Sequence, residues 1–148
     1  MPEPLRDWLA GLNETRKALS ARGFRHTATN AREALHSITR RFVTQVPEIP
    51  WIRDDLIPGP DYLVPLRIYH PEPAGTLPVA VFLHGGGHVS GSVSLYDPIA
   101  RKIALATGRI VASVEYRLAP ECPYPAAVKD ALAAVKGDAT VPELASRY

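Results

Sequence analysis

The chain has 148 residues, 46% of them hydrophobic and 22% charged, which is the composition of a globular domain long enough to bury a core. Its formal charge of +2 is too small for the electrostatic footprint of a nucleic-acid-binding protein. The single cysteine, Cys122, cannot form an internal disulfide, and no apolar run approaches the roughly 20 residues that span a bilayer. We therefore expect a cytoplasmic protein without a secretory signal or a membrane span.

Two amphipathic helices are predicted in the first 47 residues. Apolar residues recur at helical spacing from Leu5 to Leu19, and Gly23 ends this stripe. The second helix is predicted to begin with Asn30 as its N-cap, because Glu33 follows at the spacing of a capping box. The region carries eight Lys and Arg against four acids, and solvated outer helix faces explain this excess better than an anionic partner.

Short strands alternate with helices after residue 47. The first two strands flank a Pro-Gly-Pro-Asp turn and predict a β-hairpin or meander. The third is apolar at every position, so we expect it to be buried on both faces. The strands are expected at 51–57, 64–70, 79–83 and 109–116, and the helices at 96–107 and 126–136. The order of the last four elements predicts parallel strands joined by right-handed crossovers.

Three glycines follow the 79–83 strand directly, in the sequence His84-Gly-Gly-Gly-His. Consecutive glycines allow backbone conformations closed to other residues and let N–H groups approach a ligand. Two such N–H groups aimed at one point stabilise a developing oxyanion. A glycine triplet alone is nearly as compatible with a tight strand-to-helix turn that binds nothing.

Two other ligand classes fit the same segment less well. The glycine spacing ends in Ser90 instead of the third glycine of a dinucleotide-binding fingerprint, although Glu115 stands where a ribose-binding acid is expected. His84 and His88 are four residues apart, a spacing that joins two zinc ligands only within a helix, and three glycines disfavour a helix. A nucleotide-binding βαβ domain is the less favoured alternative, and no metal is expected.

Together with the residues that follow, the glycine run resembles the hormone-sensitive-lipase-like family of α/β-hydrolase esterases. The resemblance rests on His84-Gly-Gly-Gly, Gly91-Ser92 with Asp97 and Arg101, the stretch 113–121 and the stretch 123–130. It implies the N-terminal half of an α/β-hydrolase core at 48–148, with a mixed, mostly parallel and incomplete sheet. Residues 1–47 correspond, by the same resemblance, to the helical cap of the family.

The resemblance also implies roles for the glycine loop. The amides of Gly86 and Gly87 would form part of the oxyanion hole. His84 and Gly85 would support the loop, and His84 would not be the catalytic base. The family hydrolyses esters of mostly short to medium acyl chains and needs no cofactor.

Three further residues have structural roles by the same resemblance. Arg117 and Glu121 are expected to form an ion pair that fixes the loop between them. Asp130 is expected to accept hydrogen bonds from nearby backbone, Arg or Tyr groups. None of the three needs to contact the substrate.

The catalytic triad of such an esterase is missing from this sequence. The nucleophile stands on a Gly-x-Ser-x-Gly elbow, and none of the serines in the chain has glycine two residues before and after it. We expect the N-terminal part of a longer hydrolase of small-molecule esters, inactive alone, which pairs with a missing C-terminal half or self-associates. A non-catalytic remnant or interaction module is the alternative.

Overall fold

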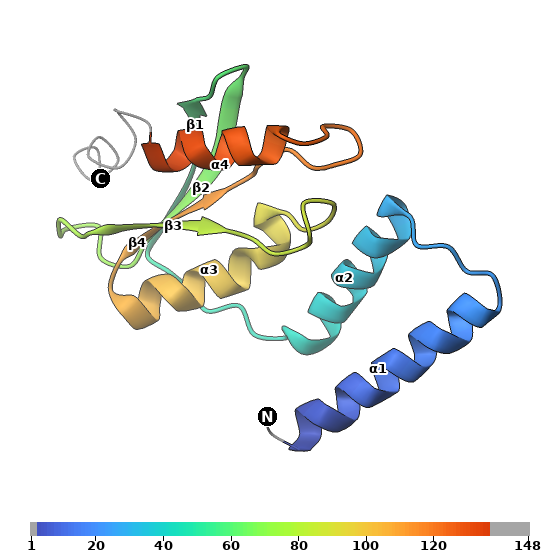
Figure 1. The fold of residues 1–148 in the computed structure, drawn as a ribbon. Coiled ribbons are helices and arrows are strands. Elements are labelled where there is room, and N and C mark those ends of the chain that lie inside the picture. The colour runs from blue at the N-terminus through green and yellow to red at the C-terminus, as the bar shows by residue number, and fades with distance from the viewer. Residues whose placement is uncertain (1–2, 137–148) are drawn as a thin grey trace.

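A computed structural model describes residues 3–136, which form a four-stranded sheet with two packed helices and two N-terminal helices (Figure 1). In chain order the elements are α1 (Glu3–Ala21), α2 (Ala28–Phe42), β1 (Trp51–Pro58), β2 (Leu63–His70), β3 (Val79–Leu83), α3 (Val93–Thr107), β4 (Ile110–Val114) and α4 (Ala126–Lys136). Across this described part, none of the helices has the length and apolar character of a membrane span.

Both predicted N-terminal helices are present, but the second begins earlier than predicted. Its N-cap is Thr27, whose hydroxyl accepts a hydrogen bond from the Asn30 N–H at 3.2 Å. The Asn30 side chain in turn accepts one from the Thr27 N–H at 2.9 Å, which completes a capping box. The predicted boundary was wrong by three residues, because Asn30 suits an N-cap as well as the third position of a box.

The sheet is mixed, with strand order β1-β2-β4-β3. The predicted hairpin is confirmed, because β1 and β2 pair antiparallel from Trp51–His70 to Pro58–Leu63. β2 pairs antiparallel with β4, whereas β3 and β4 are parallel and are connected through α3. The carboxyl ends of β3 and β4 therefore lie at the same edge of the sheet. The glycine loop leaves the first of these ends, and the 115–125 segment leaves the second.

β3 is not buried on both faces, contrary to the sequence prediction. Its residues are only partly buried, and Leu83 is 43% exposed. All five residues of β4 are buried. The difference follows from the strand order: β4 lies between β2 and β3, whereas β3 is the last strand of the sheet among residues 3–136. Among the described residues, β3 is therefore an apolar strand with one edge that pairs with no other strand.

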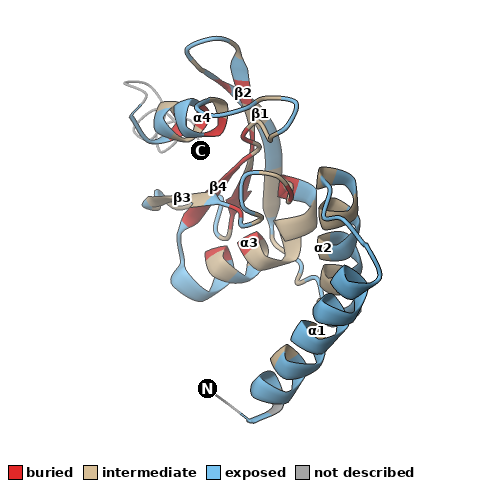
Figure 2. Cartoon of the chain, turned by 45° about the vertical axis from the view of Figure 1, so that its right-hand side comes forward, coloured by how far each residue is buried: buried red, intermediate tan, exposed pale blue. Residues whose placement is uncertain are grey.

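α3 and α4 cover opposite faces of the sheet (Figure 1). The larger core lies under α4, and α3 packs on the other face against Tyr69 and Val111. The core under α4 consists of Ile57, Val64, Leu66, Ile68, Ile110, Ala112, Val114, Tyr116, Ala127 and Ala134. α1 is almost entirely exposed and no residue of α2 is buried (Figure 2). The two N-terminal helices thus contribute little to the core.

Candidate functional site

The loop at 84–92 closes into a tight turn directly after β3. The carbonyl of Gly86 accepts hydrogen bonds from the N–H groups of Val89 and Ser90, at 3.2 and 3.0 Å, and from the Ser90 hydroxyl at 3.0 Å. Gly86 has a φ of 134°, and a Cβ atom there would overlap the Ser90 carbonyl. Position 86 therefore requires glycine.

The same turn directs the amide of Gly87 outward. The carbonyl of Gly86 and the N–H of Gly87 belong to one planar trans peptide unit and point in opposite directions. Because the carbonyl is held inside the turn, the N–H points away from it. Among residues 3–136, neither Gly86 nor Gly87 donates its N–H to an acceptor, and a Cβ on Gly87 would meet no atom within 4 Å. The loop thus holds two unpaired backbone donors, and open space lies beside Gly87.

His84 lies beneath the loop and is only 3% exposed. The Tyr116 hydroxyl donates to the His84 carbonyl at 2.5 Å and lies 3.1 Å from His84 Nδ1. Because the hydroxyl proton is used on the carbonyl, we assign the ring hydrogen to Nδ1, which also lies 3.0 Å from the Gly85 carbonyl. The imidazole stacks on the rings of Tyr116 and Tyr96, at 4.3 and 5.6 Å. The structure therefore places His84 against the loop that it was predicted to support.

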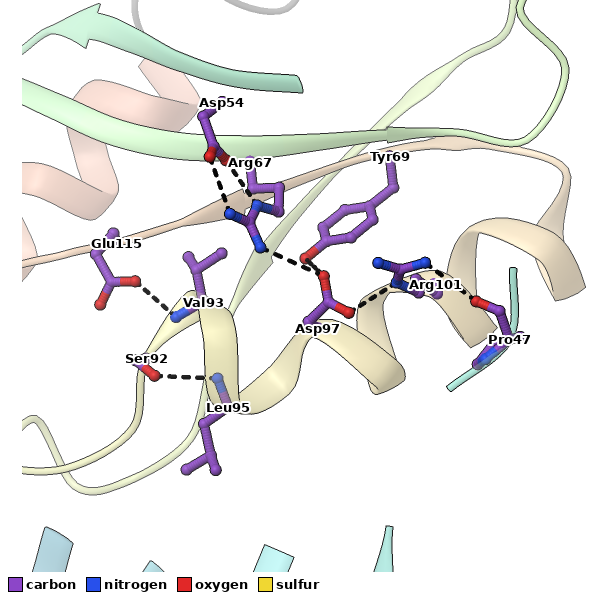
Figure 3. Close-up of polar contacts among 10 residues, drawn as sticks. All are labelled: Pro47, Asp54, Arg67, Tyr69, Ser92, Val93, Leu95, Asp97, Arg101 and Glu115. Atoms are coloured by element: carbon purple, nitrogen blue, oxygen red, sulfur yellow. Dashed lines mark hydrogen bonds and ion pairs between the residues drawn. The ribbon is translucent and has the colours of Figure 1, made fainter. Parts of the chain in front are cut away.

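The other end of the loop is fixed by the start of α3 (Figure 3). The Ser92 hydroxyl accepts the Leu95 N–H at 3.0 Å, and the Glu115 carboxylate accepts the Val93 N–H at 2.7 Å. A carboxylate is favourable at a helix N-terminus because of the helix dipole. Glu115 thus occupies the helix end at which a nucleotide phosphate would bind. This arrangement disfavours the nucleotide-binding alternative, in which Glu115 would contact a ribose.

α3 is held on the sheet through Asp97 (Figure 3). Its carboxylate accepts hydrogen bonds from the Tyr69 hydroxyl at 2.9 Å and from Arg101 at 2.7 Å. Burial, followed by this hydrogen bond, raises the pKa of Tyr69. Arg67 lies 3.5 Å from the same carboxylate and also pairs with Asp54 at 2.6 Å. The helix that follows the glycine loop is therefore joined to β2, which limits its movement.

Arg117 and Glu121 do not form the predicted ion pair. The Arg117 guanidinium binds both carboxylate oxygens of Asp130, with contacts of 2.8 and 2.9 Å. Glu121 instead binds Arg32 through two hydrogen bonds of 2.8 and 2.6 Å. The hydrogen bond from Arg32 lowers the pKa of Glu121 to about 2. The resemblance implied this pair, but the backbone between the two residues is irregular, and each side chain binds a partner from another part of the chain.

Asp130 has no exposed surface and accepts all of its hydrogen bonds from neighbouring elements. In addition to the guanidinium, the backbone N–H of Arg117 donates to it at 2.9 Å and the Tyr62 hydroxyl at 3.4 Å. The guanidinium also lies 4.5 Å above the Tyr62 ring. Burial, together with the charge of Asp130, raises the pKa of Tyr62 to about 12. Asp130 therefore contacts the kinds of group that the sequence predicted, and it joins α4 to the start of the 117–122 loop.

Arg32 is the functional candidate that the sequence analysis missed. It projects from α2 and donates to the Val89 carbonyl at 2.8 Å and to the Ala119 carbonyl at 3.0 Å, in addition to its bonds to Glu121. The Ala119 N–H donates to the His88 carbonyl at 2.8 Å, so the two loops are also joined directly. No local pattern distinguishes Arg32 from the seven other basic residues of its region, because its partners lie 57 to 89 residues away.

The hollow beside the glycine loop is incomplete within the described residues. A cavity of about 370 Å³ lies next to it and includes His88, Cys122 and Tyr124 in its lining, but neither Gly86 nor Gly87. Within residues 3–136, no three His, Cys, Asp or Glu side chains gather as metal ligands. The described residues thus provide the backbone donors of Gly86 and Gly87 and the contacts that hold their loop, but they do not enclose a pocket around these donors.

Comparison with known proteins identifies similar esterases. Residues 80–141 match a family model described as the α/β hydrolase fold. Carboxylesterase NlhH of Mycobacterium tuberculosis is 40% identical over 114 residues, which are 74% of this chain and 36% of NlhH. The solved esterase of Pyrobaculum calidifontis has a TM-score of 0.70 and 39% identity, over 78% of this chain and 39% of that one.

A relative that is named for a different role also matches. The gibberellin receptor GID1C of Arabidopsis thaliana is 38% identical over 87 residues, 47% of this chain and 25% of the receptor. The chain therefore spans between a quarter and two fifths of the length of these three proteins. The mixed sheet, the glycine loop and these similarities show that the chain carries part of an α/β-hydrolase fold and is similar to esterases of the hormone-sensitive-lipase-like family.

Proposed function

We propose that this chain supplies the oxyanion-stabilising part of a carboxylic-ester hydrolase that acts on short to medium acyl esters. The observation that carries the proposal is the pair of unpaired amides at Gly86 and Gly87, held at the carboxyl edge of the sheet. When an ester carbonyl is attacked, its oxygen becomes negatively charged, and fixed N–H donors stabilise this charge more than they stabilise the carbonyl. One such donor contributes about 100- to 1,000-fold to kcat.

The nucleophile, its base and its acid belong, in this proposal, to a part of the hydrolase outside these 148 residues. No Gly-x-Ser-x-Gly elbow occurs in the sequence. The serines of the glycine loop are already engaged, because the Ser90 hydroxyl donates to the Gly86 carbonyl and the Ser92 hydroxyl caps α3. We therefore expect the chain alone to hydrolyse no ester.

The open edge of β3 supports a role for a further strand. β3 pairs only with β4 among residues 3–136, although its sequence is apolar throughout. We infer that a strand from the rest of the protein, the one that carries the nucleophile, pairs with this edge. Without it, the unpaired backbone groups of β3 favour association with another copy.

A chimeric protein tests the proposed function. Residues 1–136 are joined to the part of NlhH that this chain does not match, which gives the NlhH chimera. We expect the chimera to hydrolyse p-nitrophenyl acetate and the 148-residue chain to be inactive. Gly86→Ala is expected to lower kcat of the chimera by about 100-fold or more, because the added Cβ forces the turn open. Gly75→Ala is the matched control, since its Cβ meets only ordinary contacts.

Two results would overturn the proposal. One is saturable ester hydrolysis by the 148-residue chain that a serine-directed phosphonate abolishes. The other is a Gly86→Ala chimera whose kcat equals that of the parent chimera. The first result would place the nucleophile within these 148 residues, and the second would place the oxyanion donors elsewhere than in the glycine loop.

A binding module is the second candidate function. It is favoured by one observation, the similarity to a protein named as a receptor rather than a hydrolase. The coding sequence downstream of Tyr148 distinguishes the two candidates. A Gly-x-Ser-x-Gly elbow followed by an acid and a histidine supports the hydrolase, whereas a stop codon at this point supports the binding module.

A further inference from the structure

Arg32 joins α2 to both loops at the carboxyl edge of the sheet. Its Nε donates to the Val89 carbonyl at 2.8 Å, and one Nη donates to the Ala119 carbonyl at 3.0 Å. The two Nη atoms bind the two carboxylate oxygens of Glu121 at 2.8 and 2.6 Å. One planar guanidinium therefore makes four hydrogen bonds to two segments that are remote from it in sequence.

The Val89 contact acts on the same turn that orients the Gly87 amide. The Val89 N–H donates to the Gly86 carbonyl, while its own carbonyl accepts from Arg32. Arg32 therefore holds the residue that closes the turn. A displacement of Val89 rotates the Gly86 carbonyl, and the Gly87 N–H rotates with it because both belong to one peptide plane.

α2 has few other means of fixing its position. None of its residues is fully buried, and its apolar residues Leu35 and Ile38 are only half-buried, so apolar packing holds the helix weakly. The ion pair with Glu121 is exposed, with 36% and 60% of the two side chains accessible, and exposed pairs contribute little to stability. The contribution of Arg32 is therefore one of geometry: its fork fixes the relative positions of the helix and the two loops.

We propose that Arg32 is a positioning residue that makes the orientation of the Gly87 amide depend on the docking of α2. When α2 is docked, the turn holds the amide outward; when α2 moves away, the turn loses its external support. The proposal rests on the proposed function, in which this amide stabilises an oxyanion. It gives the N-terminal helices a direct influence on the proposed site without any contact with the substrate.

The test measures the amides themselves in the 148-residue chain. Arg32→Met and Arg32→Lys are compared with Arg40→Met, which changes an exposed arginine of the same helix. We expect Arg32→Met to shift the Gly87 amide resonance and to raise hydrogen exchange in segment 84–92 by about tenfold or more. Exchange in α3 and β4 is expected to be unchanged, and Arg40→Met is expected to leave all of these segments unchanged.

Arg32→Lys separates geometry from charge. A lysine has one nitrogen and cannot reach the Val89 carbonyl, the Ala119 carbonyl and Glu121 together. We therefore expect its exchange in segment 84–92 to lie close to that of Arg32→Met. If Arg32→Met does not fold, Arg32→Lys alone decides the question. Wild-type exchange and an unshifted Gly87 resonance in a folded Arg32 variant would overturn the proposal.

Kinetics in the NlhH chimera distinguish this inference from the proposed function. Arg32→Met is expected to lower kcat for p-nitrophenyl acetate by about 10- to 100-fold with little change in KM, because it misplaces a donor rather than a binding group. Altered amides with an unchanged kcat would support the positioning and contradict the oxyanion role. Unaltered amides would overturn the positioning whatever the kinetics.

Discussion

Replacing Asp130 by alanine tests the anchor of the 117–122 loop. The carboxylate is fully buried and accepts hydrogen bonds from the Arg117 guanidinium, the Arg117 N–H and the Tyr62 hydroxyl. The substitution removes the acceptor for all three groups at once. Because two of them belong to the strand-to-loop junction after β4, the loss is expected to loosen the loop as well as the packing of α4.

The expected magnitude follows from burial. Removing one partner of a buried charge pair costs about 3–5 kcal/mol, because the charge and the donors left behind lose the acceptor that compensated their desolvation. A domain of this size is stable by about 5–15 kcal/mol, so this loss is a large part of the total. At about 3 °C for each kcal/mol, the thermal midpoint is expected to fall by roughly 10–15 °C.

Urea unfolding followed by tryptophan fluorescence measures this loss, and Asp61→Ala is the matched control. Asp61 also contacts the Arg117 guanidinium, at 3.4 Å, but its side chain is 51% exposed. An exposed pair of this kind contributes about 0–1 kcal/mol. Equal losses in the two variants, or a loss below about 1 kcal/mol for Asp130→Ala, would refute the argument from burial.

Gly91→Ala is expected to lower the free energy of unfolding in urea by at least about 1–3 kcal/mol, because φ is 99° and the added Cβ overlaps the buried His84 ring. Gly11→Ala is the control in α1, where a Cβ meets no atom, and it is expected to raise that free energy by about 0.5–1 kcal/mol. The pKa of Glu121, about 2, lies below its ordinary value of 4.5, so its contribution to stability is present above pH 4.5 and is lost as the pH falls toward 2. An NMR titration with an unshifted midpoint would contradict this pairing, and Arg32→Met is expected to raise the pKa of Glu121 toward its ordinary value, because a backbone hydrogen bond still lowers it. The 148-residue chain is expected to self-associate in sedimentation, and Leu83→Lys to weaken this association by adding a charge beside the open edge; a compact wild-type monomer would be inconsistent with it.

The sequence predicted the elements whose signals are local. Helix α4 has the predicted bounds, and α3 ends before Gly108, whose φ of 61° is the left-handed cap that a glycine at this position indicates. The hairpin was predictable because its turn residues and its alternation lie within one short stretch. The glycine loop was found for the same reason, since three glycines after an apolar strand are visible without knowledge of the fold.

The features that were missed depend on contacts between remote segments. The burial of β3 depends on its place in the strand order, which an apolar sequence does not specify. The partners of Arg32 come from two loops far along the chain, so its charge gave no indication of its role. Glu115 was considered as a ligand-binding acid, but its use as a cap for α3 requires the fold to bring it to Val93.

A crystal structure of the NlhH chimera with a phosphonate bound to its serine tests the oxyanion role most directly. The phosphoryl oxygen occupies the position of the negatively charged oxygen in the tetrahedral intermediate. We expect it to lie about 2.7–3.1 Å from the backbone nitrogens of both Gly86 and Gly87. A phosphoryl oxygen bound by other donors, with these two amides turned toward packed side chains, would contradict the proposal.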